Sequence, residues 1–148
     1  MSEPTAHDPD WTFLFAAWLV ATISTLGSLF FSEVMALPPC TLCWYQRIFM
    51  FPLPIVLFMG LMPTDSRGFD SRVVRYALPL AVSGWLIALY HLGLQSGVIP
   101  ERAAPCTQGV SCSDVTIQLL GFVSIPMLSL LSFTIMIGLM LALKKRLK

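Results

Sequence analysis

Charged side chains are scarce in this sequence: Asp, Glu, Lys and Arg make up only 11% of its 148 residues. Soluble domains carry about 25% charged residues. Here 56% of the residues are hydrophobic, and the mean hydropathy is +0.77. Too little polar surface remains to cover a water-facing exterior, so the composition indicates a membrane protein. The formal net charge of +1 argues against nucleic acid, which requires a clustered basic surface.

Motifs for tightly held cofactors are also missing. His7 and His91 are the only histidines, and no glycine-rich strand-to-helix turn occurs. Nothing in the sequence therefore indicates a site for flavin, haem or nicotinamide. Any redox chemistry would have to use side chains and a diffusible acceptor.

Long apolar runs are what the sequence does contain. A bilayer core about 30 Å thick needs about 20 mostly apolar residues in a helix. Length and hydropathy predict spans over approximately residues 11–32, 43–62, 73–94 and 122–143. The apolar part of the second, 48–62, is too short alone and must take length from the preceding segment CTLCWYQR. We therefore predict an all-α integral membrane four-helix bundle in one domain, residues 1–148.

The basic residues are distributed unevenly between the two sides that this topology defines. Seven of the nine Lys and Arg residues fall on the side of the termini, so the positive-inside rule predicts that both termini are cytoplasmic. The first span lacks a basic n-region and is longer than a signal peptide's apolar stretch, so we expect a retained anchor. The loops at approximately 33–46 and 95–121 would then face an oxidising, extracytoplasmic compartment. All four cysteines lie in or beside them: Cys40, Cys43, Cys106 and Cys112.

Cys40 and Cys43 form a C-x-x-C motif at the start of the second span. This spacing serves dithiol redox chemistry, but it also serves zinc, copper and iron–sulfur sites. Pro38 and Pro39 disfavour helix before Cys40, so the helix is expected to begin at or just after it. Cys43 then lies in the first turn, where unpaired N–H groups and the helix dipole favour the reactive thiolate.

Arg47 lies four residues after Cys43 and shares its helix face. Its charge would favour the Cys43 thiolate further, and its N–H groups can donate to a carbonyl oxygen of a molecule dissolved in the membrane. The alternative is that Arg47 only extends to the lipid headgroups and anchors the helix. Trp44 and Tyr45 fit an interfacial aromatic belt.

Cys106 and Cys112 enclose five residues, a spacing compatible with a small disulfide ring. One interpretation is a structural staple. The other is exchange with the first pair, because two pairs on one side of a membrane can exchange through a mixed disulfide. Electrons would then pass from an outside dithiol through the second pair to Cys40 and Cys43, and onward to a lipid-soluble oxidant. A membrane quinone, ubiquinone or menaquinone, fits the lack of a protein-held cofactor.

His91 is expected near the external end of the third span, at the membrane level of Cys43. Polar groups inside a membrane are usually partnered, so His91 is either hydrogen-bonded within the bundle or in contact with the quinone. Gln95, four residues later, shares its face and is a candidate partner for either.

Several of these stretches together resemble the disulfide bond formation protein B (DsbB) family, in particular its short Gram-positive-like members. They are CTLCWYQR after one span, YHLGLQ at the end of the third, and C-T-x-G-x-x-C before a span containing FVSIPMLSL. The resemblance covers residues 11–143. It implies an enzyme of the bacterial plasma membrane that reoxidises a DsbA-like thioredoxin-fold thiol oxidase on the extracytoplasmic side and passes the electrons to a quinone.

The resemblance also implies roles for the cysteines. Cys106 would form the mixed disulfide with the thioredoxin-fold partner, and Cys112 would be its disulfide partner. Cys40 would take part in the exchange between the two pairs. Cys43 would be the thiolate that faces the quinone.

Arg47 and His91 would lie at the quinone ring by the same resemblance. The sequence departs from longer family members in its second loop, where only five residues separate Cys106 from Cys112. That leaves no room for a long mobile segment between them.

Three other interpretations stay open. The four cysteines could together form a zinc or copper site, although the spacing of the second pair exceeds the usual two to about four residues. Vitamin K epoxide reductase-like proteins also combine four helices with two cysteine pairs. Their quinone-facing C-x-x-C is expected near the end of the bundle, whereas here it follows the first span. The third is a membrane scaffold with two inert disulfides.

Overall fold

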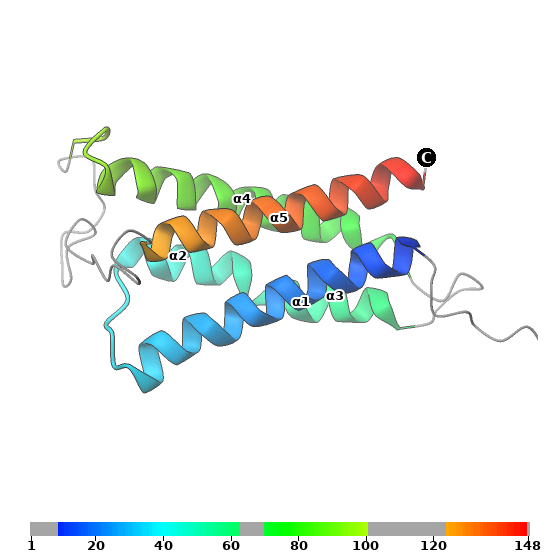
Figure 1. Ribbon diagram of the computed structural model, residues 1–148, viewed down its shortest axis with the longest axis horizontal. Helices are drawn as coiled ribbons and strands as arrows, with labels where there is room; N and C mark the ends of the chain where they lie inside the picture. Colours follow the sequence, from blue (N-terminus) through cyan, green and yellow to red (C-terminus); the bar gives the residue numbers. More distant parts are fainter. Residues whose placement is uncertain (1–8, 63–69, 101–123, 148) are drawn as a thin grey trace, which may run out of the picture.

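The computed structural model describes residues 9–62, 70–100 and 124–147, and the described part of the chain contains helices and no strand (Figure 1). Four helical segments are long and apolar enough to cross a membrane, which confirms the predicted all-α, four-span architecture. The first is α1, Pro9–Leu29, continued by the π-helix η1, Phe30–Val34; the others are α2, Thr41–Met50, with α3, Pro52–Leu61; α4, Val73–Gln95; and α5, Ile125–Arg146.

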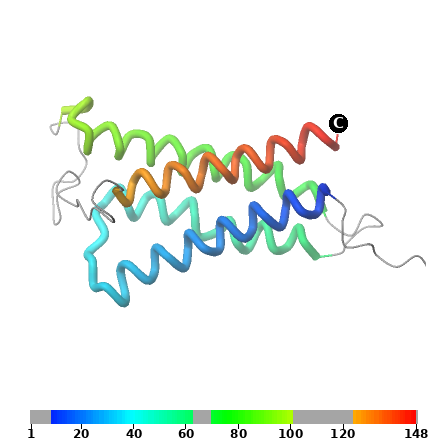
Figure 2. The backbone as a smooth tube through the Cα atoms, in the orientation of Figure 1, coloured from blue at the N-terminus to red at the C-terminus, as the bar shows by residue number. Residues whose placement is uncertain are grey.

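The second span is divided in two, where the sequence predicted one helix over 43–62. α2 ends and α3 begins around Phe51, because Pro52 and Pro54 have no N–H to donate to the preceding turn. Phe51 itself keeps helical dihedral angles, φ −64° and ψ −35°, so the chain continues through it without a loop (Figure 2). The span begins at Thr41 and therefore takes its length from CTLCWYQR, as predicted.

The last span is displaced by about one turn from its predicted position, 122–143. Ser124 has extended dihedral angles and Pro126 stands in the first turn of α5, a position that proline favours because its missing N–H has no helical partner there. The helix continues through the basic residues 144–146, whose charges interact favourably with the negative end of the helix dipole. Residues 122 and 123 lie outside the described residues.

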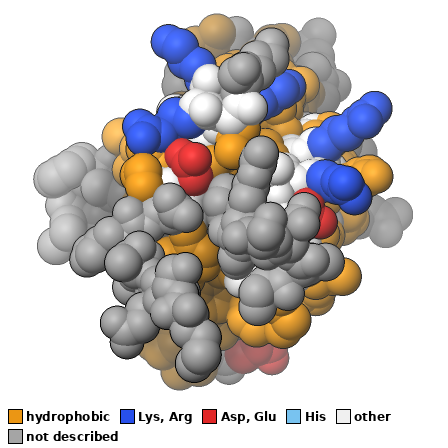
Figure 3. Space-filling model, turned by 90° about the vertical axis from the view of Figure 1, so that its right-hand side faces the viewer, with side chains coloured by type: hydrophobic (Ala, Val, Ile, Leu, Met, Phe, Trp, Pro, Cys, Tyr) orange, Lys and Arg blue, Asp and Glu red, His pale blue; other side chains and the backbone are white. Residues whose placement is uncertain are grey.

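The start of α1 and the end of α5 lie at the same end of the bundle (Figure 1). Arg146 Nε donates to Asp10 Oδ1 over 2.9 Å and links the two helices there. Figure 3 looks onto this end and shows Lys and Arg side chains around it. The last turn of α5 contributes Lys144, Lys145 and Arg146. An even number of spans is thus confirmed, and the cytoplasmic location of this end stays a prediction.

Small residues line the buried face of α4. A Cβ at Gly84 would overlap the ring of Phe133 from α5, so only glycine permits this approach. Small side chains bring membrane helices close together. The buried small residues follow one another at intervals of three or four: Ala77, Ala81, Gly84 and Ala88. His91 continues this row, and its side chain therefore points into the bundle.

Large apolar side chains cover the outer surface of the bundle, among them Ile23, Ile55, Leu86 and Leu131. In water an apolar surface of this extent would drive association. In lipid it needs no cover, because the helices satisfy their own backbone hydrogen bonds.

Candidate active site

The connection between the first two spans carries the C-x-x-C motif at the end of the bundle opposite the termini (Figure 1). The chain leaves η1 through Ala36, whose φ of 52° is left-handed. Leu37 N–H donates to Phe31 O over 3.1 Å and closes the helix end much as a Schellman motif does. Two prolines follow, which prevent further helix, and the chain then enters α2 at Cys40.

Cys40 is the N-cap of α2, with φ −71° and ψ 168°. Its Sγ accepts a hydrogen bond from Cys43 N–H over 3.3 Å and lies 2.8 Å from Cys43 Sγ. The helix therefore begins where the prolines predicted. The sequence predicted that the N–H groups of the first turn favour the Cys43 thiolate, whereas the sulfur that accepts a hydrogen bond from this turn is that of Cys40. Hydrogen bonding with the Cys43 side chain lowers the pKa of Cys40, against the effect of burial, and His91 acts in the same direction.

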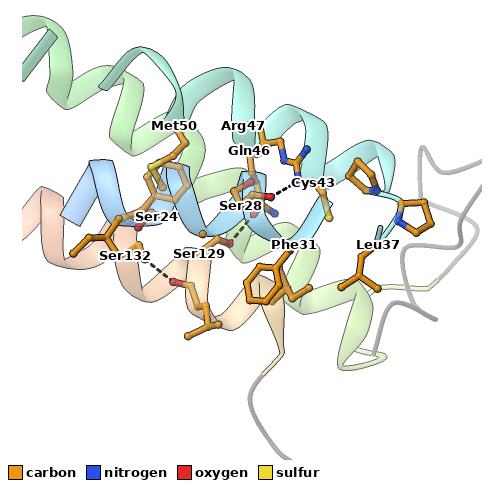
Figure 4. A pocket seen from close by; sticks show the side chains of 17 residues that line it. Ser24, Ser28, Phe31, Leu37, Cys43, Gln46, Arg47, Met50, Ser129 and Ser132 are labelled. Atoms are coloured by element: carbon orange, nitrogen blue, oxygen red, sulfur yellow. Dashed lines mark hydrogen bonds between the residues drawn. The ribbon is translucent and has the colours of Figure 1, made fainter. Parts of the chain in front are cut away.

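Cys43 faces a cavity of about 270 Å³ enclosed by α1, η1, α2 and α5 (Figure 4). Most of the lining is apolar, and Ile23, which is 60% exposed on the outer surface, is part of it. The cavity thus reaches the surface that lipid covers. Its polar lining residues are Ser24, Ser28, Gln46, Arg47, Ser129 and Ser132. Cys40 is not among the lining residues.

Arg47 lies on the cavity wall and connects α2 to α1. Its Nη2 donates to Ser28 O over 2.9 Å, and its guanidinium carbon lies 5.3 Å from the centre of the Trp44 ring. Among the described residues Ser28 O is its one hydrogen-bond acceptor. A guanidinium carries five N–H donors, so Arg47 has further N–H groups that can donate to a molecule in the cavity.

His91 is 1% exposed and is not among the residues that line the cavity. Its Nε2 is 3.8 Å from Cys40 Sγ, and its Nδ1 is 3.0 Å from Gln46 Nε2. Gln46 Oε1 in turn lies 2.6 Å from Ser129 Oγ of α5. His91 is thus hydrogen-bonded within the bundle, and its partner is Gln46. Gln95 Oε1 is buried without a hydrogen-bond partner in the part of the chain that the structure describes.

The family model for disulfide bond formation protein DsbB matches residues 10–143, nearly the whole chain. The chain belongs to the DsbB family. It is accordingly a multi-pass membrane protein and a disulfide-forming oxidoreductase, as the resemblance of its motifs implied.

Curated relatives of this DsbB-family protein are similar over most of their length. A probable disulfide formation protein of Metapseudomonas resinovorans is 44% identical over 145 residues, which cover 97% of each chain. Disulfide bond formation protein C of Bacillus subtilis strain 168 is 44% identical over 132 residues, 89% of this chain and 92% of the relative. Probable disulfide formation protein C 2 of Bacillus cereus is 45% identical over 121 residues, 82% and 83% respectively. No solved structure matches.

A metal ion would find three donors in the described part of this DsbB-family protein. The ligand atoms of Cys40, Cys43 and His91 all lie within 4.8 Å of one another. Two sulfurs and one imidazole nitrogen suit zinc or copper. The predicted four-cysteine metal site would also need Cys106 and Cys112, which lie outside the described residues.

Two polar residues of this site were absent from the sequence prediction. Gln46 follows Cys43 by three residues and is an uncharged polar residue inside an apolar span, which is a usable signal because such groups are usually partnered. Ser129 gave no such signal, since serine is common where membrane helices pack.

Proposed function

We propose that this DsbB-family protein is a quinone-dependent thiol-disulfide oxidoreductase that reoxidises an extracytoplasmic thioredoxin-fold thiol oxidase. The observation that carries the proposal is the division of one cysteine pair between two environments. Cys43 lines a cavity that reaches the lipid-covered surface, while Cys40, 2.8 Å away, lies outside that cavity. One disulfide can thus connect a membrane-soluble acceptor to thiols at the end of the bundle.

In the sequence, the second cysteine pair lies between α4 and α5, outside the described residues. The end of α4 and the start of α5 lie at the same end of the bundle as the start of α2 (Figure 1). Exchange between the pairs therefore requires no passage through the membrane. This supports the roles that the family resemblance assigns to the four cysteines.

The cavity fits the headgroup of a membrane quinone, ubiquinone or menaquinone. Such a headgroup is a flat, mostly apolar ring with two carbonyl oxygens, and it would enter from the lipid beside Ile23. When bound, the quinone supplies an acceptor for two electrons and two protons. Arg47 and the hydroxyls of Ser24 and Ser28 would hold it by donating to its carbonyl oxygens, and Cys43 would be the sulfur beside it.

The thiol steps balance within the protein and its partner. A partner thiolate attacks Cys106 in the Cys106–Cys112 disulfide, forms a mixed disulfide with it and releases Cys112 as a thiolate. The second partner thiol then displaces Cys106 from the mixed disulfide. The partner is now oxidised, and the Cys106–Cys112 pair is reduced. Cys106 or Cys112 then bonds to Cys40 in the Cys40–Cys43 disulfide, and Cys43 departs as a thiolate at the cavity. Displacement of Cys40 by the remaining thiol leaves the first pair carrying two electrons and two protons.

Purified protein mixed with a reduced thioredoxin-fold partner and a soluble quinone analogue should reduce the quinone catalytically, followed by quinone absorbance. No rate above the uncatalysed reaction, with a partner shown to be competent, would refute the proposal. A stoichiometric metal released together with four free thiols would favour the metal-site alternative instead. Omitting the protein and, separately, the partner gives the two background rates.

Replacing Arg47 by alanine should raise the quinone concentration needed for half-maximal rate by about tenfold or more, because a hydrogen bond from a charged donor contributes about 1.5–3 kcal/mol. The variant Arg47→Lys keeps the charge but loses the forked geometry, so we expect an intermediate value. Steady-state rates at varied quinone concentration measure the effect. If the dependence of the rate on quinone concentration is unchanged in both variants, Arg47 does not bind the quinone and only anchors the helix.

A further inference from the structure

A buried chain of hydrogen bonds leads from the lining of the cavity to Cys40 and does not include Arg47. It runs from Ser129 of α5 to Gln46 of α2, from Gln46 to His91 of α4, and from His91 to the sulfur of Cys40. His91 and Gln46 are 1% and 7% exposed, so water does not substitute for these partners. The order of donors and acceptors along the chain decides which nitrogen of His91 holds its proton.

The contact with Ser129 fixes the orientation of the Gln46 amide. Ser129 Oγ and Gln46 Oε1 are 2.6 Å apart, shorter than the usual N–H···O distance of about 2.9–3.0 Å and typical of O–H···O. Two oxygens so close need a hydrogen between them, so Ser129 donates here although Pro126 O, at 2.9 Å, offers another acceptor. The amide nitrogen of Gln46 then faces His91.

The tautomer of His91 follows from that orientation. An amide NH2 group only donates, so Nδ1 of His91, 3.0 Å from Gln46 Nε2, has to accept. A neutral imidazole that accepts at Nδ1 carries its hydrogen on Nε2. Nε2 is the nitrogen that lies 3.8 Å from Cys40 Sγ.

We propose that Gln46 is a positioning residue that keeps the proton of His91 on Nε2, so that the ring donates a hydrogen bond to Cys40 and stabilises its thiolate. Ser129 acts through Gln46 by fixing the amide. His91 thereby serves the sulfur outside the cavity, while Arg47 serves the cavity itself. The inference deepens the proposed function, because Cys40 leaves as a thiolate in the second step of the exchange between the two pairs, when the remaining thiol displaces it.

Within the described residues, few other titratable or charged groups surround Cys40. On α2 these are Cys43, whose sulfur is in contact, and Arg47, which is directed to Ser28 O. On α4 Tyr90 packs against the same cluster as Cys40. Within its described range, α5 has no titratable side chain before residue 144 at the opposite end. A change in the titration of Cys40 on altering Gln46 therefore reports on His91.

The test is a titration of the full-length protein with Cys106 and Cys112 replaced by serine and the remaining pair reduced. The reduced Cys40 and Cys43 pair titrates with two midpoints. Ultraviolet absorbance of the thiolate, followed against pH, gives the lower of these two midpoints. Gln46→Met keeps the volume of the side chain but cannot donate, and it should raise this midpoint by about half to one pH unit. Ser129→Ala should raise it by less, and His91→Ala by more.

The matched control is Gln95→Met, the same substitution at a glutamine whose buried oxygen makes no hydrogen bond within the described residues. Its midpoint should equal that of the parent. An unchanged or lowered midpoint in both Gln46→Met and Ser129→Ala, in protein that keeps its helical circular dichroism, would overturn the inference. The titration uses neither quinone nor partner. The role of Gln46 can therefore be refuted while the proposed quinone reduction is upheld, and the proposed quinone reduction can be refuted while the role of Gln46 is upheld.

Discussion

Replacing Cys43 by serine is expected to abolish quinone reduction while the protein still oxidises its partner once. Cys43 is the cysteine of the first pair that lines the cavity, and a hydroxyl cannot form or pass on a disulfide. The Cys106–Cys112 disulfide would still accept two electrons from a reduced partner. Turnover should therefore stop after about one equivalent, and quinone absorbance should fall only at the uncatalysed rate.

A small dithiol used in place of the partner separates the two halves of this reaction. Cys106→Ser should block electron transfer from the protein partner but leave some quinone reduction driven by the dithiol, which can reduce the first pair directly. Cys43→Ser should show none with either reductant. A scaffold with inert disulfides predicts instead that neither substitution changes any electron transfer. Full quinone turnover in Cys43→Ser would remove Cys43 from its proposed place.

Filling the cavity should be nearly as damaging as removing the sulfur. Gly27 of α1 lines it, and a Cβ added there meets no atom within 4 Å. Gly27→Leu should therefore fold normally, place its side chain in the cavity and exclude the quinone headgroup. We expect the quinone concentration for half-maximal rate to rise at least about tenfold, equivalent to about 1.4 kcal/mol. Quinone titrations measure it, and single-turnover oxidation of the partner should be unaffected.

Gly138 provides the matched control. It also lies in a membrane-spanning helix, a Cβ there again meets no atom within 4 Å, and it is not part of the cavity lining. Gly138→Leu should therefore keep the quinone dependence of the parent. Equal behaviour of the two variants would show that the quinone does not use this cavity.

The sequence predicted the architecture well because lipid imposes simple requirements. A helix that crosses a bilayer must be long and apolar, and the four spans satisfied that test before any contact was known. Pro52 and Pro54 are a sequence signal for the division of the second span at Phe51, although hydropathy and length alone predict one continuous helix there. The π-helical end of the first span has no comparable signature.

The site was harder to predict, because its contacts join residues far apart in the chain. The C-x-x-C motif and Arg47 were identifiable from their spacing on one helix. The pairing of His91 with Cys40, fifty-one residues earlier, depends on how α4 packs against α2, and hydropathy carries no information on that. The row of small residues that ends at His91 marks the buried face of α4, but it does not specify which residue of another helix contacts His91.

The opposite orientation of Cys40 and Cys43 has a kinetic consequence. Cys43 faces the cavity and Cys40 faces His91, so the bond between the two sulfurs is the point of contact between a lipid side and a protein side. Under the proposed function, the protein partner and the quinone therefore do not need to occupy the enzyme together. Each can bind, react and leave in its own half-reaction, and the redox state of the Cys40–Cys43 pair links the two half-reactions. This is the pattern of a ping-pong mechanism.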